Sequence, residues 1–321
     1  MNALVTGVAG FIGSHLASAL LDSGALVTGV DCFTDYYPKA LKEANLATLR
    51  GRPQFSFLDA ALQRADLAVL LRGKTHVFHL AAQAGVRKSW GRDFDVYTVN
   101  NVEATQRLLE ALVSVPIERF VYASSSSVYG NDVPLPMRED ARLQPLSPYG
   151  VTKLAAEHLA NLYWTNHGVP AVSLRYFTVY GPRQRPDMGF HRFMRAVQQR
   201  QPVTVYGDGE QTRDFTFVSD AVAATILAAT KGRAGGVYNV GGGSRVTVNR
   251  VLEQIGQLAG VPVTIQREAD QKGDMRHTYA DTSLAKQDLG FSPLVSLNEG
   301  LERQYRWLQG LQGLRGTQAP A

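Results

Sequence analysis

The sequence predicts an α/β fold in which a doubly wound parallel sheet is followed by a smaller C-terminal lobe. Short apolar runs alternate with amphipathic segments through the first half of the chain. A glycine-rich turn, Gly7 to Gly13, separates the first apolar run from the first amphipathic segment. The alternation weakens after Gly181, where prolines and short segments take over. Strand–helix alternation of this kind implies right-handed βαβ units with helices on both faces of a parallel sheet.

The elements follow from length and periodicity. We expect buried strands at 3–6, 25–30, 54–58, 76–80, 119–123, 171–175 and 237–240. We expect helices at 11–23, 61–71, 93–113, 148–167, 248–259 and 297–309. The predicted domains are a nucleotide-binding domain at 1–180, to which part of 214–240 returns, and a substrate-binding lobe at 181–213 and 241–310. Residues 311–321 read as a loose tail.

Composition excludes several classes of protein. The net charge is +5 and the pI near 9.3, but basic residues are scattered and most are arginine, which favours small anionic ligands over nucleic acid. Cys32 is the only cysteine, which excludes an internal disulfide and a cysteine-rich metal site. No run of eighteen apolar residues predicts a membrane span. We expect a cytoplasmic protein that binds no metal, membrane or nucleic acid.

The N-terminal turn predicts a dinucleotide site. Gly7 permits a tight turn, Gly10 lets the backbone approach a pyrophosphate, and Gly13 lets the helix pack on the strand. Asp31 closes the next strand eighteen residues later, where a carboxylate accepts from ribose hydroxyls and favours NAD over NADP. The fold is therefore expected to be of the Rossmann type. Asp59 fits an adenine contact and a helix N-cap equally well. The other expected cofactor contacts are Phe11, Ile12 and Ala81.

A second group of residues predicts proton transfer. Tyr149 and Lys153 are four residues apart on a predicted helix, so they share one face. A lysine ammonium and the positive nicotinamide of oxidised NAD would favour the tyrosine phenolate. Ser125 follows a predicted strand, at the sheet edge where such folds bind ligands. A surface Tyr and Lys beside a serine loop explain the pattern equally well when it is taken alone.

Several motifs occur together in workable order. They are Thr6-Gly7-x-x-Gly10-x-x-Gly13, His79-Leu80-Ala81-Ala82, Ser124 to Gly130, Ser147-Pro148-Tyr149-Gly150-x-x-Lys153 and Gly207-Asp208-Gly209-x-x-Thr212-Arg213-Asp214-Phe215. In this combination the chain resembles the extended short-chain dehydrogenase/reductases, specifically nucleotide-sugar epimerases, over nearly its whole length. The segments 31–37, 81–87, 175–182 and 185–188 resemble UDP-glucuronate 4-epimerases most. Two positions differ: Gln184 stands where those enzymes often have glycine, and Cys32 where they often have Asp or Asn.

The resemblance implies an NAD-dependent 4-epimerase acting through a transient 4-keto sugar. Tyr149 would take the C4 hydroxyl proton, Ser125 would be the catalytic Ser/Thr, and Lys153 would hold the nicotinamide ribose. The residues expected to bind substrate are Arg87, Asn101, Ser126, Ser127, Thr178, Arg185, Arg213 and Arg276. Among them, Thr178 and Arg185 are the candidates for a sugar carboxylate, although a guanidinium also suits a diphosphate and Arg185 could be a surface arginine.

The serines separate this chain from other relatives. Dehydratases and decarboxylases of the group place a carboxylate where Ser126 and Ser127 stand, so the resemblance implies epimerisation. The expected reaction is UDP-glucuronate to UDP-galacturonate. Epimerisation of UDP-glucose or its N-acetyl analogue is the alternative, and a non-catalytic NAD-binding regulator is a remote one. The resemblance also implies a homodimer formed through 93–113 and 148–167.

Overall fold

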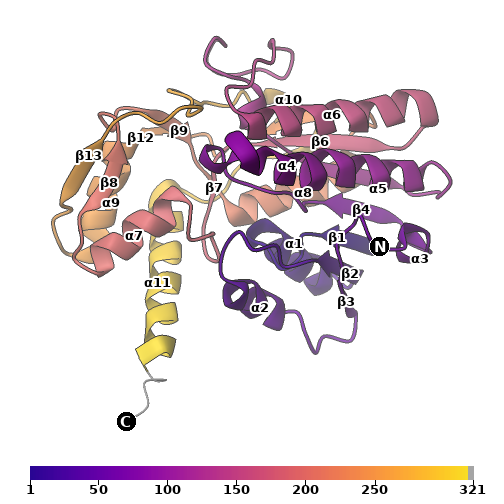
Figure 1. Cartoon of the computed structure of the whole chain (residues 1–321), viewed down its shortest axis with the longest axis horizontal. Coiled ribbons are helices and arrows are strands. Elements are labelled where there is room, and N and C mark those ends of the chain that lie inside the picture. Colours follow the sequence, from indigo (N-terminus) through magenta and orange to yellow (C-terminus); the bar gives the residue numbers. More distant parts are fainter. Residues whose placement is uncertain (317–321) are drawn as a thin grey trace.

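The computed structural model describes residues 1–316, and for 312–316 it describes the backbone alone. Its centre is a seven-stranded parallel sheet in the order β11-β6-β5-β4-β1-β2-β3 (Figure 1). The strands are β1 (Asn2–Thr6), β2 (Leu26–Asp31), β3 (Phe55–Asp59), β4 (His76–His79), β5 (Arg119–Ser125), β6 (Ala171–Tyr176) and β11 (Val237–Val240). All seven expected strands and the doubly wound sheet are confirmed.

The strand order reverses next to β1. This strand pairs with β2 on one side and β4 on the other, and Thr6 lies opposite both Val30 and His79. The carboxyl ends of the three strands therefore meet at one edge of the sheet. Ligands of open α/β sheets bind at such a reversal.

Helices cover both faces of the sheet (Figure 1). One face carries α3 (Leu67–Leu71), α5 (Ala104–Leu112) and α6 (Pro148–His167), whose apolar side chains share one buried cluster. On the other face, α1 (Phe11–Asp22) and α8 (Val218–Lys231) share a second cluster with the sheet. The turns and short helices between these elements are α2 (Lys39–Ala47), η1 (Arg87–Ser89), η2 (Gly91–Asp93), α4 (Phe94–Tyr97), η3 (Thr98–Glu103) and η4 (Ser126–Val128).

The expected helices differ from the observed ones in two places. The helix expected at 61–71 is wrong for its first half, because Asp66 caps a shorter helix: its carboxylate accepts from Val69 N (3.1 Å) and 62–64 form a turn. The segment 93–113 is helical in successive pieces, with the π-helical turn η3 between α4 and α5. Four helices were not predicted from the sequence: α2, α7 (Gly189–Gln198), α8 and α10 (Ser283–Leu289).

Most of the remaining elements gather beyond the carboxyl edge of the sheet (Figure 1). Three two-stranded pairs are β7 (Val179–Tyr180) with β10 (Thr216–Phe217), β9 (Thr212–Asp214) with β12 (Arg245–Thr247), and β8 (Val203–Tyr206) with β13 (Ile265–Glu268). The helices here are α7 (Gly189–Gln198), α9 (Val248–Ala259) and α11 (Leu297–Gly316), whereas α10 (Ser283–Leu289) packs against α8 and the edge strand β11. Because α11 continues to Gly316, the tail expected from 311 does not begin there, and 317–321 lie outside the described residues.

Within residues 1–316, no helix is both long enough and apolar enough to cross a bilayer. The same residues contain no group of three His, Cys, Asp or Glu side chains placed to hold a metal ion.

Candidate functional site

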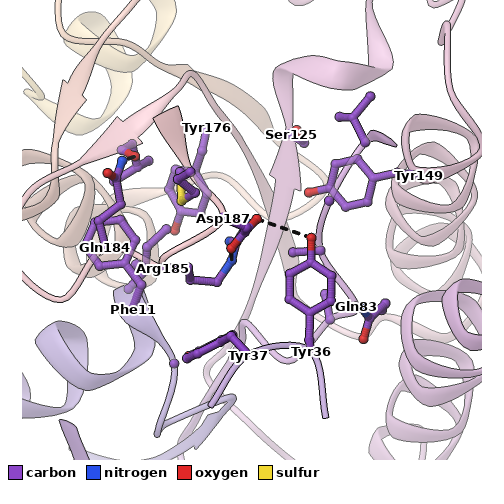
Figure 2. Close-up of a pocket in the computed structure, with 18 of the residues that line it drawn as sticks. Phe11, Tyr36, Tyr37, Gln83, Ser125, Tyr149, Tyr176, Gln184, Arg185 and Asp187 are labelled. Carbon is purple, nitrogen blue, oxygen red and sulfur yellow. Dashed lines mark hydrogen bonds and ion pairs between the residues drawn. The ribbon is translucent and has the colours of Figure 1, made fainter. Parts of the chain in front are cut away.

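A cavity of about 790 Å³ lies between the carboxyl edge of the sheet and the elements beyond it. This volume suits a sizeable small-molecule ligand. Its walls come from the turn after β1, the ends of β2, β4 and β5, the start of α6 and the loop 181–188 (Figure 2).

The glycine turn forms one end of the cavity. Gly7 has a φ of +71°, and a Cβ there would lie 2.8 Å from Ala81 N. A Cβ on Gly13 would collide with the Gly7 carbonyl oxygen, so only glycine lets α1 start this close to β1. Gly10 precedes α1 and supplies no side-chain cap, which leaves the first N–H groups of the helix to a ligand. Phe11, Ile12 and Ala81 line the same end.

Asp31 completes this end from the tip of β2. Its carboxylate accepts hydrogen bonds from Ala9 N (3.0 Å) and Phe33 N (2.9 Å). Burial raises the pKa of Asp31, and these two hydrogen bonds and nearby Lys42 partly oppose the rise. A glycine cradle, free helix N–H groups and a carboxylate at the next strand are the features that fit a dinucleotide.

Asp59 does not line the cavity, and no helix starts after it. It is the last residue of β3, directly opposite Asp31 in the sheet, and its side chain is exposed. The helix cap expected at Asp59 is therefore wrong, and the adenine contact stays a prediction. The neighbouring Ala60 lines the cavity in its place.

Tyr149, Lys153 and Ser125 meet in the middle of the cavity wall. The Ser147 hydroxyl caps α6 by accepting from Gly150 N (3.1 Å), and Pro148 occupies the first turn, so Tyr149 lies at the helix start. A Cβ on Gly150 would collide with the Ser127 carbonyl oxygen, so glycine lets α6 pack directly on η4. Ser125 ends β5 and lies near the Tyr149 ring (Figure 2). We call these three residues the reaction corner.

Burial controls the charges in the reaction corner. It raises the pKa of Tyr149, and the Arg185 guanidinium and the Ser125 hydroxyl partly lower it again. Burial lowers the pKa of Lys153 to about 7, and Glu157 partly opposes this shift. Arg185, which the sequence assigned to substrate, is thus also the cation that favours the Tyr149 phenolate.

A buried ion pair lies beneath the reaction corner. Arg175 on β6 donates to both carboxylate oxygens of Glu157, with Nη2 to Oε1 at 2.6 Å. Ser124 donates to Glu157 Oε2 (2.5 Å), which ties the end of β5 to α6. Both charged side chains are 4% exposed, so the pair fixes the strand end that carries Ser125 against the helix that carries Lys153.

The loop 181–188 brings Arg185 to the opposite wall. Asp187 accepts from Arg185 Nε and Nη2, each at 3.0 Å, and from the Tyr36 hydroxyl at 3.2 Å (Figure 2). Thr178, Ser126 and Ser127 also line the cavity. A carboxylate of the chain itself therefore occupies the guanidinium fork of Arg185.

Two further arginines line the far end of the cavity. Arg87 pairs with Asp274 (Nη2 to Oδ2, 2.7 Å) and lies 4.1 Å over the Tyr206 ring. Arg213 donates to the Thr212 carbonyl oxygen (2.9 Å) and leaves further donors for an anion.

Two expected substrate residues are not brought to the cavity. Both N–H groups of the Asn101 amide are used: they donate to Gln83 O and Thr152 Oγ1, both at 3.0 Å, while the amide oxygen accepts from Gln83 N (2.7 Å). It joins the loop after β4 to α6. Arg276 is held outside by Asp208, with guanidinium–carboxylate distances of 2.8 and 2.6 Å.

Several residues that line the cavity were not predicted from the sequence as site residues. The main ones are Tyr36, Lys42, Gln184, Asp187, Tyr206 and Asp274. Tyr36 and Asp187 lie inside segments that carry the resemblance, which was the available signal. Asp274 and Tyr206 carry no motif and come to the cavity only through the tertiary fold.

Comparison with known proteins agrees with this geometry. Residues 3–241 match the NAD dependent epimerase/dehydratase family. An uncharacterized UDP-glucose epimerase of Bacillus subtilis is 46% identical over 97% of this chain and 99% of its own length. The UDP-glucuronate 4-epimerase of Thermodesulfobacterium geofontis is 38% identical over 95% of each chain. The Bacillus cereus UDP-glucuronic acid 4-epimerase, crystallised with UDP-glucuronic acid and NAD, superposes with a TM-score of 0.95 at 44% identity, covering 97% of this chain and 100% of the other. The chain therefore belongs to the NAD dependent epimerase/dehydratase family.

Proposed function

We propose that the protein interconverts UDP-glucuronate and UDP-galacturonate by NAD-dependent epimerisation at C4 of the sugar. The observation that carries this proposal is one cavity that holds a dinucleotide cradle, the reaction corner and Arg185 together. The glucuronate epimerases of Thermodesulfobacterium geofontis and Bacillus cereus support it from outside this chain.

Each residue of the reaction corner has a distinct task. Tyr149 takes the proton from the C4 hydroxyl and later returns it to the same oxygen. Ser125 holds that oxygen by a hydrogen bond. In the structure without substrate its hydroxyl interacts with Tyr149 instead, which lowers the pKa of Tyr149. Lys153 holds the nicotinamide ribose. Bound NAD⁺ supplies the reversible hydride acceptor at C4.

The cofactor fits residues that the structure brings together. The N–H groups at the start of α1 face the expected pyrophosphate, and Gly10, which has no side chain, leaves it room. Asp31 holds the adenosine ribose and disfavours a 2′-phosphate, so NAD is preferred to NADP.

The sugar carboxylate is recognised by Arg185 and Thr178. Arg185 presents a planar fork that binds carboxylates through two parallel hydrogen bonds, and Thr178 adds a hydroxyl on the same wall. When the substrate binds, its carboxylate replaces Asp187 on Arg185. The diphosphate goes to Arg87 and Arg213 at the far end.

Epimerisation of UDP-glucose is the second candidate, because the Bacillus subtilis relative bears that name. The two activities differ at C6, where a neutral hydroxymethyl group would leave the charge of Arg185 to Asp187 alone. Whether Arg185 binds a sugar carboxylate therefore decides between the two activities.

The test is incubation of the purified protein with UDP-glucuronate and, separately, with UDP-glucose, followed by NMR of the anomeric and C4 protons. We expect UDP-galacturonate to accumulate until the two UDP-uronates reach equilibrium, and we expect little conversion of UDP-glucose. Turnover of UDP-glucose alone would overturn the proposal. Binding of NAD without turnover of any nucleotide sugar would favour the non-catalytic regulator.

We also propose that the protein is a homodimer in the cytoplasm. Large apolar side chains are exposed along the outer faces of α4, η3 and α6: Val96, Val99, Val151 and Leu162 are 45%, 41%, 49% and 54% exposed. A second copy that packs these helices against its own would bury them. Light scattering of wild type and Val99→Glu tests this, since the charge is expected to shift the protein toward monomer.

A further inference from the structure

The loop 181–188 has no regular secondary structure, yet it must hold Arg185 at a fixed place in the cavity. Gln184, the residue directly before Arg185, is 3% exposed. Its side chain is therefore inside the protein, and each of its polar atoms needs a partner.

Gln184 finds those partners on three elements. Its Nε2 donates to Val179 O on β7 (3.2 Å), and its Oε1 accepts from His191 N on α7 (3.0 Å). The same Oε1 accepts from Nε2 of Gln304 on α11 (2.7 Å). The Gln184 carbonyl oxygen also contacts His191 Nδ1 (2.8 Å).

Gln304 closes the arrangement from the C-terminal helix. It is 0% exposed, and its Oε1 accepts from Gly181 N (2.9 Å), the first residue of the loop. One side chain of α11 thus bonds both to the start of the loop and to the neighbour of Arg185. We call Gln184 and Gln304 the glutamine clamp.

We propose that Gln304, acting through Gln184, is a positioning residue that fixes Arg185 for the UDP-sugar. This inference rests on the proposed function. The two glutamines form the clamp because an amide offers a donor and an acceptor in one plane, and the clamp needs both. Because the clamp holds the loop at Gly181 and at Gln184, the loop presents the Arg185 guanidinium in one orientation. Recognition of a planar anion requires such a fixed orientation.

The clamp is tested by a double-mutant cycle between Gln304→Met and Arg185→Ala. Methionine keeps the length of glutamine but can make neither bond. In the wild-type background we expect Gln304→Met to raise KM for UDP-glucuronate roughly tenfold, with a much smaller change in kcat. In the Arg185→Ala background the same change should leave KM unaltered, because the side chain that it positions is gone.

Gln254→Met is the matched control. Gln254 lies on α9 and donates to Asn298 (2.5 Å), which is on α11, the helix that also carries Gln304. Gln254 does not line the cavity. It should leave KM unchanged. Gln184→Met gives a second route to the answer if Gln304→Met does not fold, and thermal melting of each variant separates folding from positioning.

An equal rise in KM in both backgrounds, or no rise in either, would overturn the clamp while leaving the proposed reaction standing. Failure of the wild-type protein to turn over UDP-glucuronate would instead overturn the proposed function itself.

Discussion

The reaction corner and the loop 181–188 face each other across one cavity but are built differently. Tyr149 and Lys153 lie on a capped helix of twenty residues, and Ser125 ends a strand of the main sheet. Beneath them the Glu157–Arg175 pair is 4% exposed. Across the cavity, Arg185 lies on a loop without regular structure, and the Arg185 and Asp187 side chains are 21% and 31% exposed.

This difference in structure matches two different tasks: proton transfer at the reaction corner and substrate selection at the loop 181–188. A proton acceptor must keep its place through the reaction, and buried regular elements provide that rigidity. An arginine that selects the substrate, as we propose for Arg185, must exchange one carboxylate for another, which a partly exposed ion pair permits at low cost. Changes in the reaction corner should therefore abolish turnover, whereas changes in the loop should alter the apparent affinity for substrate.

Tyr149→Phe should have the largest effect. The substitution removes the hydroxyl that we propose takes the C4 hydroxyl proton, so kcat should fall by about a thousandfold or more. Binding of NAD, measured by calorimetry, should be retained because the ring still fills its place. Substantial remaining epimerisation would show that another group moves the proton.

Lys153→Met should lower kcat by roughly a hundredfold and at the same time stabilise the fold. The pKa of Lys153 is lowered to about 7, so the folded protein binds fewer protons than the unfolded chain between that pH and the ordinary lysine pKa. Stability contributed at this site therefore rises with pH across that window and is lowest below pH 7. Denaturant unfolding should show that Lys153→Met raises the free energy of unfolding more at pH 6 than at pH 9. An equal rise at both pH values would contradict a lowered pKa of Lys153 in the folded protein.

Arg185→Ala should raise KM for UDP-glucuronate by roughly ten- to a hundredfold. It should also move the acid limb of the kcat profile to higher pH, because the guanidinium lowers the pKa of Tyr149. Arg183→Ala is the control: its side chain donates to Ser14 Oγ (3.3 Å) and does not line the cavity. If the two variants behave alike, Arg185 does not bind substrate.

Asp187→Asn should have the smallest effect and the opposite sign. The amide no longer competes as an anion for Arg185, so KM for UDP-glucuronate should fall about two- to fivefold. KM for UDP-glucose should change less, because that sugar brings no carboxylate to Arg185. A rise in KM for the uronate would mean that Asp187 supports binding rather than competing with it.

The parts of the molecule that depend on local chemistry could be predicted from the sequence. The strands were visible as short apolar runs, and the glycine turn and the Tyr149–Lys153 spacing have meanings that do not depend on distant residues. The reaction corner and most of the dinucleotide cradle follow from such signals. They lie at the ends of regular elements, where the fold leaves little choice of position.

What the sequence did not reveal depends on contacts between distant segments. Asn101 was predicted to bind substrate, but its side-chain amide forms hydrogen bonds with Gln83 and Thr152 in the structure. Arg276 is held outside the cavity by Asp208, 68 residues away in the chain. The Arg185–Asp187 pair and the glutamine clamp require knowledge of side-chain directions and of α11, which no spacing in the sequence supplies.

The central claim is that hydride leaves and returns to C4 within one active site. It is tested most directly with UDP-glucuronate deuterated at C4, incubated with the NAD-loaded protein in ordinary water. The account predicts UDP-galacturonate that retains its deuterium at C4, as read by NMR and mass spectrometry. Loss of the deuterium to solvent, or no UDP-galacturonate at all, would contradict it.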